Sequence, residues 1–277
     1  MTIIRPPQYA WAAAFEDVAA ALVYALTALG HRVSYQDNNL RAEAQNIVPG
    51  GHLLNPAQWP LLDQVPVILY NFEQFPTQLA HFPGYDALLR RRYPLWDYAA
   101  RNVAWLWDTW RLPAQHVPLG YVPVWTRLPP HPAKDIDVLF YGSQTPRRRA
   151  VLDRLAQAGL SVVAATDAYG LARDAYLARS RVVLNCHQFG PDDAPELVRL
   201  LYLWANRCAV VSEAATPEAV PDGYHDAAVW VPYEALAEAC HALVRDVARQ
   251  AQLGDAAWAA VQRQPFVATL ARVLTTK

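Results

Sequence analysis

The stretch "DVLFYGSQTPRRRAVLDRLAQAGLSVV", residues 137–163, indicates the fold class of the second half of the chain. It begins with an apolar run, breaks at Gly142, starts a helix behind Thr145 and Pro146, and ends in a second apolar run. Thr145 is suited to cap this helix, and Pro146 suits its first position, where no backbone N–H is needed. The pattern predicts a strand, a turn, a helix and a second strand.

The same alternation continues towards the C-terminus. We expect further strands at 181–187, 208–212 and 227–231, and helices at 171–180, 195–206 and 233–250. Short apolar strands that alternate with helices predict an α/β fold with a doubly wound parallel sheet. In the first half, "TIIRP", a helix ending at Leu29, "HRVSYQ" and "VPVILYNFE" predict a similar alternation.

The two halves of the chain differ in composition. Fifteen of the 22 prolines and seven of the ten tryptophans precede residue 134. The stretch 117–135 contains five of these prolines, and such a composition suits an extended linker. We therefore predict two domains, 1–133 and 134–277.

Composition also limits the function classes. The formal net charge is −1 over 277 residues, so no bulk attraction to nucleic acid or anionic lipid is expected. Cys186, Cys208 and Cys240 lack metal-ligand spacing and indicate reduced thiols, with no metal site. The alanine-rich stretch 11–29 carries two acidic residues and no cleavage signal, which predicts a buried helix. These features predict a cytoplasmic protein with no membrane span.

The break at Gly142 lies where open parallel sheets bind ligands, beyond the carboxyl ends of the strands. Free amides at the N-terminus of the following helix attract phosphate, and Arg147, Arg148 and Arg149 add full charges nearby. The alternative interpretation is an ordinary helix start followed by a solvated arginine run. Because neither a dinucleotide-binding nor a P-loop fingerprint is present, hydride transfer and ATP hydrolysis are not expected.

A second informative segment is "RVVLNCHQFGPDDAPELVRLLYLWANRCAVVSE", residues 181–213. It contains two predicted strand ends, and the polar residues there are expected to face the same crevice as the turn after the first strand: Asn185, His187, Ser212 and Glu213. Glu213 is placed to accept both hydroxyls of a ribose. His187 is a candidate catalytic residue and is equally consistent with a hydrogen-bonded core histidine.

Glu196 and Arg199 are three residues apart on the intervening helix and share one face. Asp193-x-x-Glu196 also has the pattern of a capping box. A catalytic role at the donor and a capping role for Glu196 therefore both stay open.

The runs "IDVLFYGSQTPRRRAVLDRL", "YGLARDAYLARSRVVLNCHQ" and "ELVRLLYLWANRCAVVSE" resemble bacterial glycosyltransferases of the GT-B type, in particular the CgeB-like group. The resemblance covers roughly residues 134–250, and "VILYNFEQF" and "YPLWDYAARNVAWL" extend it upstream. It implies a nucleotide-sugar-dependent transferase with two Rossmann-like domains that face a central cleft. The second domain would bind the donor, and the first would face an unidentified acceptor.

The resemblance also implies roles for individual residues. Gly142, Ser143 and an arginine among Arg147, Arg148 and Arg149 would lie near the donor diphosphate, and Glu196 and Arg199 would lie at the diphosphate or the sugar. Tyr169 and Gly170 would lie near the nucleobase, and Glu213 near the ribose. Asn185 and Ser212 would belong to the same donor site. Apart from the nucleotide sugar as co-substrate, neither a cofactor nor a metal is expected.

One motif departs from the pattern. Many retaining GT-B enzymes carry two glutamates separated by seven residues, and here Tyr202 occupies the place of the second and Ala194 lies near the first. If the reaction inverts the anomeric carbon, a general base must come from the acceptor side. The candidates are Asp37, His52 and Glu73, and Glu73 has the best position because it directly follows an apolar strand.

Two other functions stay open at this stage. One is a non-catalytic GT-B-like module that binds a nucleotide sugar or acts as a scaffold. The other is a GT-B-fold epimerase or phosphorylase, which would use a similar phosphate pocket. The fold alone does not distinguish these from a transferase.

Overall fold

The computed structural model describes residues 2–5, 12–37, 39–129, 133–190 and 194–275. The chain divides into two compact units, which we call unit 1 (residues 1–124 and 265–277) and unit 2 (residues 125–264). The expected single boundary at 133/134 differs from this division in two ways. The division falls earlier, before Trp125, and the C-terminal residues return to unit 1.

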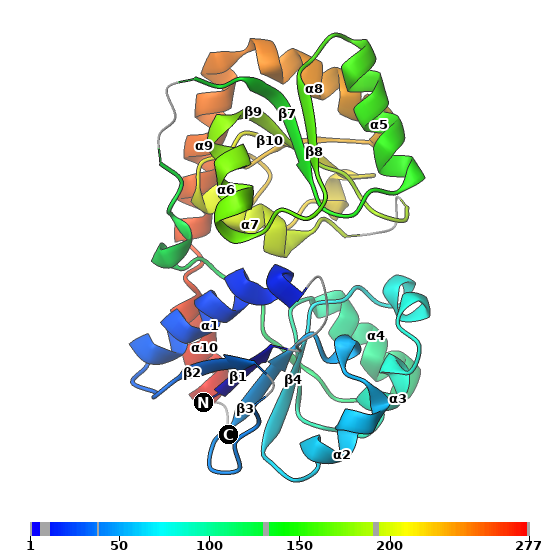
Figure 1. The fold of residues 1–277 in the computed structure, drawn as a ribbon, viewed down its shortest axis with the longest axis vertical. Helices are drawn as coiled ribbons and strands as arrows, with labels where there is room; N and C mark the ends of the chain where they lie inside the picture. The colour runs from blue at the N-terminus through cyan, green and yellow to red at the C-terminus, as the bar shows by residue number, and fades with distance from the viewer. Residues whose placement is uncertain (1, 6–11, 38, 130–132, 191–193, 276–277) are drawn as a thin grey trace. The chain divides into compact units, whose positions relative to one another are not determined.

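Unit 1 is built on a parallel sheet with the strand order β2-β1-β3-β4-β5-β6. Its elements are β1 (Thr2–Arg5), α1 (Glu16–Ala28), β2 (Ser34–Asp37), β3 (Asn46–Pro49), α2 (Trp59–Leu62), β4 (Val67–Asn71), α3 (Tyr85–Leu89), β5 (Leu95–Asp97), α4 (Ala100–Trp110), β6 (Gln115–His116) and α10 (Phe266–Thr275). Figure 1 shows α10, drawn in red, beside α1, drawn in blue, and the two helices are in contact.

Unit 2 is built on a second parallel sheet with the order β11-β10-β9-β7-β8. Its elements are β7 (Ile136–Tyr141), α5 (Pro146–Gln157), β8 (Val162–Ala165), α6 (Gly170–Arg179), β9 (Ser180–Asn185), α7 (Leu197–Ala205), β10 (Val210–Glu213), β11 (Val229–Val231), α8 (Leu236–Arg245) and α9 (Val247–Gln262). The chain reverses direction across the sheet after β8. With right-handed crossovers, this reversal places α5 on one face and α6 and α7 on the other.

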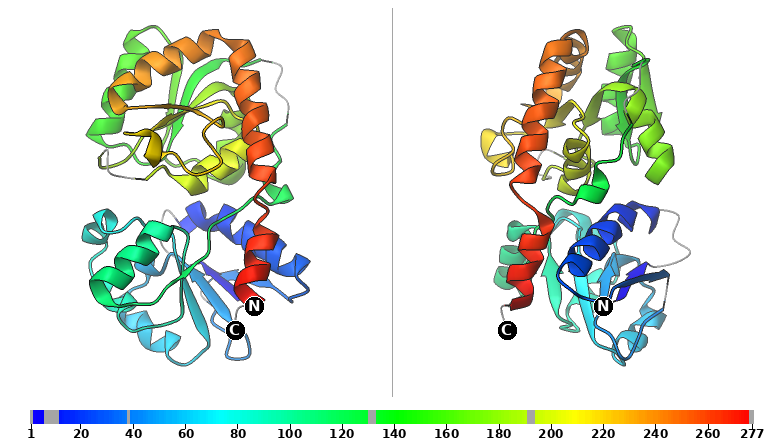
Figure 2. Two further views of the ribbon diagram at one scale, coloured as in Figure 1. Left: turned by 180° about the vertical axis from the view of Figure 1, so that it is seen from behind. Right: turned by 90° about the vertical axis from the view of Figure 1, so that its left-hand side faces the viewer.

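The predicted α/β class is confirmed in both units, because each sheet is parallel and alternates with helices. In unit 2 the apolar side chains of β7, β9 and β10 pack against those of α5 and α8. Phe140, Val151 and Leu184 in this cluster are fully or almost fully buried. Helix α8 lies beside α5, and both views of Figure 2 show α9 continuing from α8 along unit 2. In the part of the chain that the structure describes, no helix is long and apolar enough to cross a membrane.

The expectation of one helix over 233–250 is wrong. A short 3-10 turn precedes α8, and a break at Asp246 separates α8 from α9. At Asp246 the backbone leaves the helical region (φ −110°, ψ 82°), and its side chain accepts a hydrogen bond from Arg249 N–H. Asp246 therefore caps a new helix, as aspartate commonly does.

Candidate functional site

The turn after β7 brings the backbone of unit 2 to the carboxyl edge of its sheet. Gly142 has a φ of +125°, a region that is essentially restricted to glycine. A Cβ atom at this position would lie 2.8 Å from Nη2 of Arg199, so a side chain there would meet the guanidinium. The absence of a side chain leaves room for the Arg199 guanidinium beside the turn.

The predicted start of helix α5 is confirmed. Thr145 is the N-cap residue and accepts a hydrogen bond from Arg148 N–H at 3.3 Å, and Pro146 occupies the first turn. The Thr145 hydroxyl also donates to the Gln188 carbonyl at 3.3 Å, which joins the turn to the chain after β9. Strands β7 and β9 are neighbours, and their carboxyl ends form the point where the strand order reverses.

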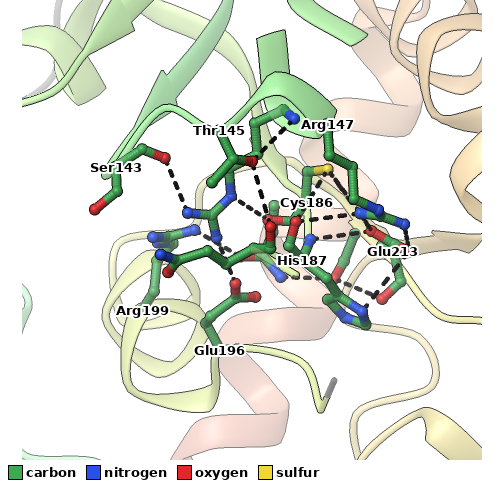
Figure 3. A network of polar contacts seen from close by, with 12 residues as sticks. Ser143, Thr145, Arg147, Cys186, His187, Glu196, Arg199 and Glu213 are labelled. Carbon is green, nitrogen blue, oxygen red and sulfur yellow. Dashed lines mark hydrogen bonds and ion pairs between the residues drawn. The ribbon is translucent and has the colours of Figure 1, made fainter. Parts of the chain in front are cut away.

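Arg147 forms a bidentate ion pair with Glu213, which ends β10 (Figure 3). The Glu213 side chain is 1% exposed and also accepts a hydrogen bond from His187 N–H at 3.0 Å. Burial raises the pKa of Glu213, but hydrogen bonds from Arg147 and the His187 backbone outweigh it and lower the pKa below its ordinary value. A ribose at Glu213 would have to share a carboxylate that Arg147 already holds.

Arg148 joins three segments of the same edge. Its guanidinium donates to the Cys186 carbonyl (2.9 Å), the Ser143 carbonyl (3.0 Å) and Glu196 Oε1 (2.8 Å). Only 3% of its side chain is exposed, and burial together with the neighbouring Arg199 charge lowers the pKa of Arg148. Arg148 is therefore committed to protein contacts.

Glu196 is the residue before α7, because this helix begins at Leu197. A capping box would need Glu196 at the third helical position, so that interpretation is wrong; Asp193 lies outside the described residues. The Glu196 side chain instead accepts the hydrogen bond from Arg148, and its Oε2 is buried with no partner among the residues that the structure describes.

Arg199 differs from the other two arginines in its partners. It donates to Asn185 Oδ1 at 3.0 Å, Asn185 in turn donates to Ser212 Oγ at 3.0 Å, and the guanidinium lies 5.0 Å from the centre of the Tyr141 ring. No carboxylate within the described ranges pairs with Arg199. The Arg147–Glu213 and Arg148–Glu196 pairs are each neutral, so among the described residues of this cluster Arg199 carries one excess positive charge.

His187 is fully buried beside Glu213, with Nδ1 3.7 Å from Glu213 Oε1. Neither ring nitrogen has a hydrogen-bond partner in the described part of the chain. Burying an imidazole whose two nitrogens lack hydrogen-bond partners costs folding free energy, unless a ligand or water supplies the missing hydrogen bonds.

The remaining predicted donor residues lie at the same edge of the sheet. Ser143 and Arg149 are exposed at the start of α5, Tyr169 and Gly170 lie where α6 begins after β8, and Ser212 is buried near the end of β10. The structure therefore brings the strand-end residues together as expected.

Tyr202 is buried in the position where the retaining motif has a glutamate. Its hydroxyl donates to Asp174 Oδ1 at 2.7 Å, and Arg173 stacks 3.7 Å from its ring centre. Burial raises the pKa of Tyr202 well above its ordinary value, so the hydroxyl stays protonated. This tyrosine supports the core of unit 2.

Unit 1 contains a second polar cluster, at the carboxyl ends of β3, β4 and β5. His52 Nε2 lies 3.1 Å from Glu73 Oε1, and their side chains are 4% and 16% exposed. Burial lowers the pKa of His52 to about 3 and raises the pKa of Glu73 to about 7. A carboxyl group with a pKa near neutrality is suited to take up and release protons. Two of the three predicted base candidates thus lie in contact.

The sequence interpretation missed three buried residues below this pair: Asn71, Asp97 and Asn102. Asp97 ends β5, accepts hydrogen bonds from both asparagines, and has a pKa that burial raises to about 7. The available signal was their position, because Asn71 and Asp97 each end an apolar strand. Of the aromatic residues on β5, after it and on α4, Trp96 and Tyr98 are buried, whereas Trp107 is 51% exposed.

Comparisons with known proteins identify the fold. No protein-family model and no curated protein sequence matches the chain. Solved structures do match over essentially the whole chain. Sucrose-phosphate synthase from Thermosynechococcus elongatus is 13% identical with a TM-score of 0.63, covering 99% of this chain and 98% of its own. HepE of Anabaena in complex with UDP and glucose is 11% identical with a TM-score of 0.63, covering 100% and 99%. An alpha-glucosyltransferase in complex with UDP and a 13-mer DNA is 11% identical with a TM-score of 0.67, covering 100% and 99%.

These likenesses span both units, and identities this low establish the fold rather than the reaction. The chain therefore has the GT-B fold of two parallel-sheet α/β units that these glycosyltransferases share.

Proposed function

We propose that this protein is a nucleotide-sugar-dependent glycosyltransferase and that unit 2 binds the donor. The observation that carries the proposal is Arg199, a cation without a carboxylate partner in the described chain, next to a glycine-only turn and the N-terminus of α5. A diphosphate supplies the missing negative charge, and a helix N-terminus stabilises it further. The bound UDP of HepE and of the alpha-glucosyltransferase supports a nucleoside diphosphate as the ligand class.

Within this proposal the donor diphosphate contacts Gly142, Ser143 and Arg199. Glu196 Oε2 and the ring nitrogens of His187, which are buried and have no hydrogen-bond partner among the described residues, contact the donor sugar or its leaving group in this proposal. Tyr169 and Gly170 contact the nucleobase, and Asn185 and Ser212 orient Arg199. Arg147 shapes the ribose side through Glu213, and Arg149 adds charge at the rim.

On the acceptor side we propose Glu73 as the general base, since its carboxyl group is partly exposed and its pKa lies near neutrality.

No metal takes part, because the helix N-terminus and Arg199 stabilise the leaving diphosphate. Transfer should therefore persist in EDTA. The similarity of residues 134–250 to the CgeB-like group supports a bacterial cytoplasmic enzyme of that kind.

A panel of nucleotides and nucleotide sugars, screened by thermal shift, tests this function. A donor at 100 times its Kd stabilises the native state by about 2.7 kcal/mol, so the melting temperature should rise by several degrees with a nucleoside diphosphate or its sugar. Nucleosides without phosphate should have little effect. If no member of the panel raises the melting temperature, the proposal is wrong.

Product analysis with the best donor then separates the three functions. Slow release of free sugar and nucleoside diphosphate indicates a transferase that uses water in place of its acceptor. Interconversion of the sugar indicates an epimerase, and phosphate-dependent sugar release a phosphorylase. Binding with no turnover indicates a non-catalytic module.

A further inference from the structure

Two asparagine side chains hold the backbone of Glu73 in unit 1. Asn71 Nδ2 and Asn102 Nδ2 both donate to the Glu73 carbonyl oxygen, at 2.9 and 2.8 Å. Asn71 Oδ1 accepts a hydrogen bond from Glu73 N–H at 3.1 Å. Both backbone polar groups of Glu73 are therefore fixed by side chains, in a loop that has no sheet ladder to fix it.

Asp97 connects the two asparagines. Asn71 Nδ2 donates to Asp97 Oδ2 at 2.7 Å, and Asn102 Nδ2 donates to Asp97 Oδ1 at 3.0 Å. The other oxygens are satisfied as well: Asn102 Oδ1 accepts from Phe75 N–H, and Asn71 Oδ1 from the Tyr85 hydroxyl. All three side chains belong to residues that are at most 1% exposed. Buried polar networks whose members are all satisfied are rigid.

The carboxyl group of Glu73 is less enclosed than this network. It contacts His52 through Oε1 and keeps 16% of its side chain exposed. Two titratable groups face it: His52 before α2 lies 3.1 Å away, and Tyr85 on α3 feels the charge of Glu73. Asp97 on β5 lies in the network below, where the charge of Arg101 on α4 acts on it. A rigid backbone below a partly open carboxylate is the arrangement that a positioned base requires.

We propose that Asn71, Asp97 and Asn102, which we call the Glu73 mount, are positioning residues that hold the Glu73 carboxylate against His52 so that it receives the acceptor proton. The inference rests on the proposed transferase function. In the transfer step the acceptor oxygen bonds to the anomeric carbon of the donor and its proton passes to Glu73. The bond from that carbon to the phosphate oxygen breaks, and its electron pair leaves with the nucleoside diphosphate.

A substitution that changes the mount without changing its size tests the inference. Asn102→Asp keeps an acceptor for Phe75 N–H but removes one of the two side-chain donors to the Glu73 carbonyl and adds a second carboxyl group beside Asp97. Carbon-13 NMR of protein labelled at the glutamate side-chain carboxyl follows the glutamates without aspartate signals, and the Glu73 signal is the one that is missing from Glu73→Gln protein. We expect a Glu73 titration midpoint near pH 7 in the wild-type protein, and a midpoint higher by about one pH unit or more in the variant.

Asn55→Asp is the matched control, because Asn55 is an exposed capping residue and aspartate caps equally well. It should leave the Glu73 midpoint unchanged. An unchanged midpoint in folded Asn102→Asp protein would overturn the inference. Should this variant not fold, the exchanged pair Asp97→Asn with Asn102→Asp restores the amide–carboxylate bond, while the Glu73 carbonyl keeps the Asn71 donor and loses the Asn102 donor. If the Glu73 midpoint in the exchanged pair equals the wild-type value, the three residues form a purely structural network. This result would likewise overturn the inference.

Turnover gives an independent readout. With UDP-glucose, or the donor that the panel identifies, and water as acceptor, Asn102→Asp should lower kcat about tenfold, which is about 1.4 kcal/mol in the barrier. The donor KM should stay unchanged, and the acid limb of the pH–rate profile should move to higher pH. If the wild-type protein binds no nucleotide sugar, the proposed function fails, while the NMR titration still decides whether the mount positions Glu73.

Discussion

Gly142→Val is expected to abolish binding of nucleoside diphosphates, with the affinity falling by at least about 100-fold. Two effects of the substitution act together. A Cβ atom would lie 2.8 Å from Nη2 of Arg199 and push this cation from its place. A β-branched residue also avoids a φ of +125°, so the turn that precedes α5 must change shape.

Gly159→Val separates backbone strain from the loss of the site. Gly159 follows α5 with a φ of +81°, and a Cβ atom there would meet nothing within 4 Å. This control should lose stability because of its backbone conformation and keep its affinity. Calorimetric titration of both folded variants with UDP gives the comparison. An affinity in Gly142→Val equal to that in Gly159→Val would remove the turn from the binding site.

Glu213→Ala is expected to destabilise the folded chain by about 3–5 kcal/mol at neutral pH. The substitution removes the carboxylate that pairs with Arg147, whose side chain is only 18% exposed, and leaves a desolvated guanidinium without a counter-ion. It also removes the acceptor for His187 N–H. This structural loss is larger than the effect expected from ribose contacts alone, so donor affinity should be compared only below the melting transition.

The size of that loss should depend on pH. The pKa of Glu213 is lower in the folded protein than its ordinary value, so the carboxylate contributes stability above about pH 4.3, the value typical of unfolded chains. This contribution disappears as the pH falls through the folded pKa, and the wild-type protein and the variant should then converge. Urea unfolding between pH 3 and 8 measures the difference.

Exposed Glu238 on α8 supplies the control for Glu213→Ala, because Glu238→Ala should change stability little. Adding Arg147→Ala to Glu213→Ala should recover part of the loss, since the unpaired charge is then removed as well. Equal effects of Glu213→Ala and Glu238→Ala would contradict the buried ion pair.

Local sequence pattern predicted unit 2 well because its strands are short apolar runs bounded by glycine or polar residues. The start of α5 could be placed at Pro146, since the capping threonine and the proline act within one turn of the chain. In unit 1 the alternation was harder to detect. Strands β3, β5 and β6 span four, three and two residues, too few to show a period.

Side-chain partners in the site were not predictable in the same way. Arg147 and Glu213 are 66 residues apart, and both are charged residues that the pattern places at one sheet edge. A residue's position at the end of a strand indicates that it lies at this edge of the sheet. The pairing of each cation with a particular carboxylate depends on how the side chains pack in the folded protein. The sequence therefore predicted the location of the site, whereas the pairing that leaves Arg199 as the excess charge required the structure.

The contacts within the Glu73 mount were likewise not predictable from the sequence. Asp97 and Asn102 occur in "LWDYAARN", which reads as an apolar strand followed by a helix start. Nothing in that stretch indicates that Asn71 approaches from the neighbouring strand β4, because strand adjacency is set by topology. Only the register of β4 and β5, which pairs Asn71 with Asp97, brings the three side chains together.

Calorimetric titration of Arg199→Gln with UDP tests the central claim most directly. Loss of a charge-assisted contact to phosphate costs roughly 1.5–3 kcal/mol, so the affinity should fall by about ten- to 100-fold relative to the wild-type protein. Arg245→Gln, which removes an exposed arginine at the end of α8, should bind UDP as the wild-type protein does. UDP affinity in Arg199→Gln equal to that of the wild-type protein, or no UDP binding by the wild-type protein at all, would contradict a donor diphosphate site at Arg199.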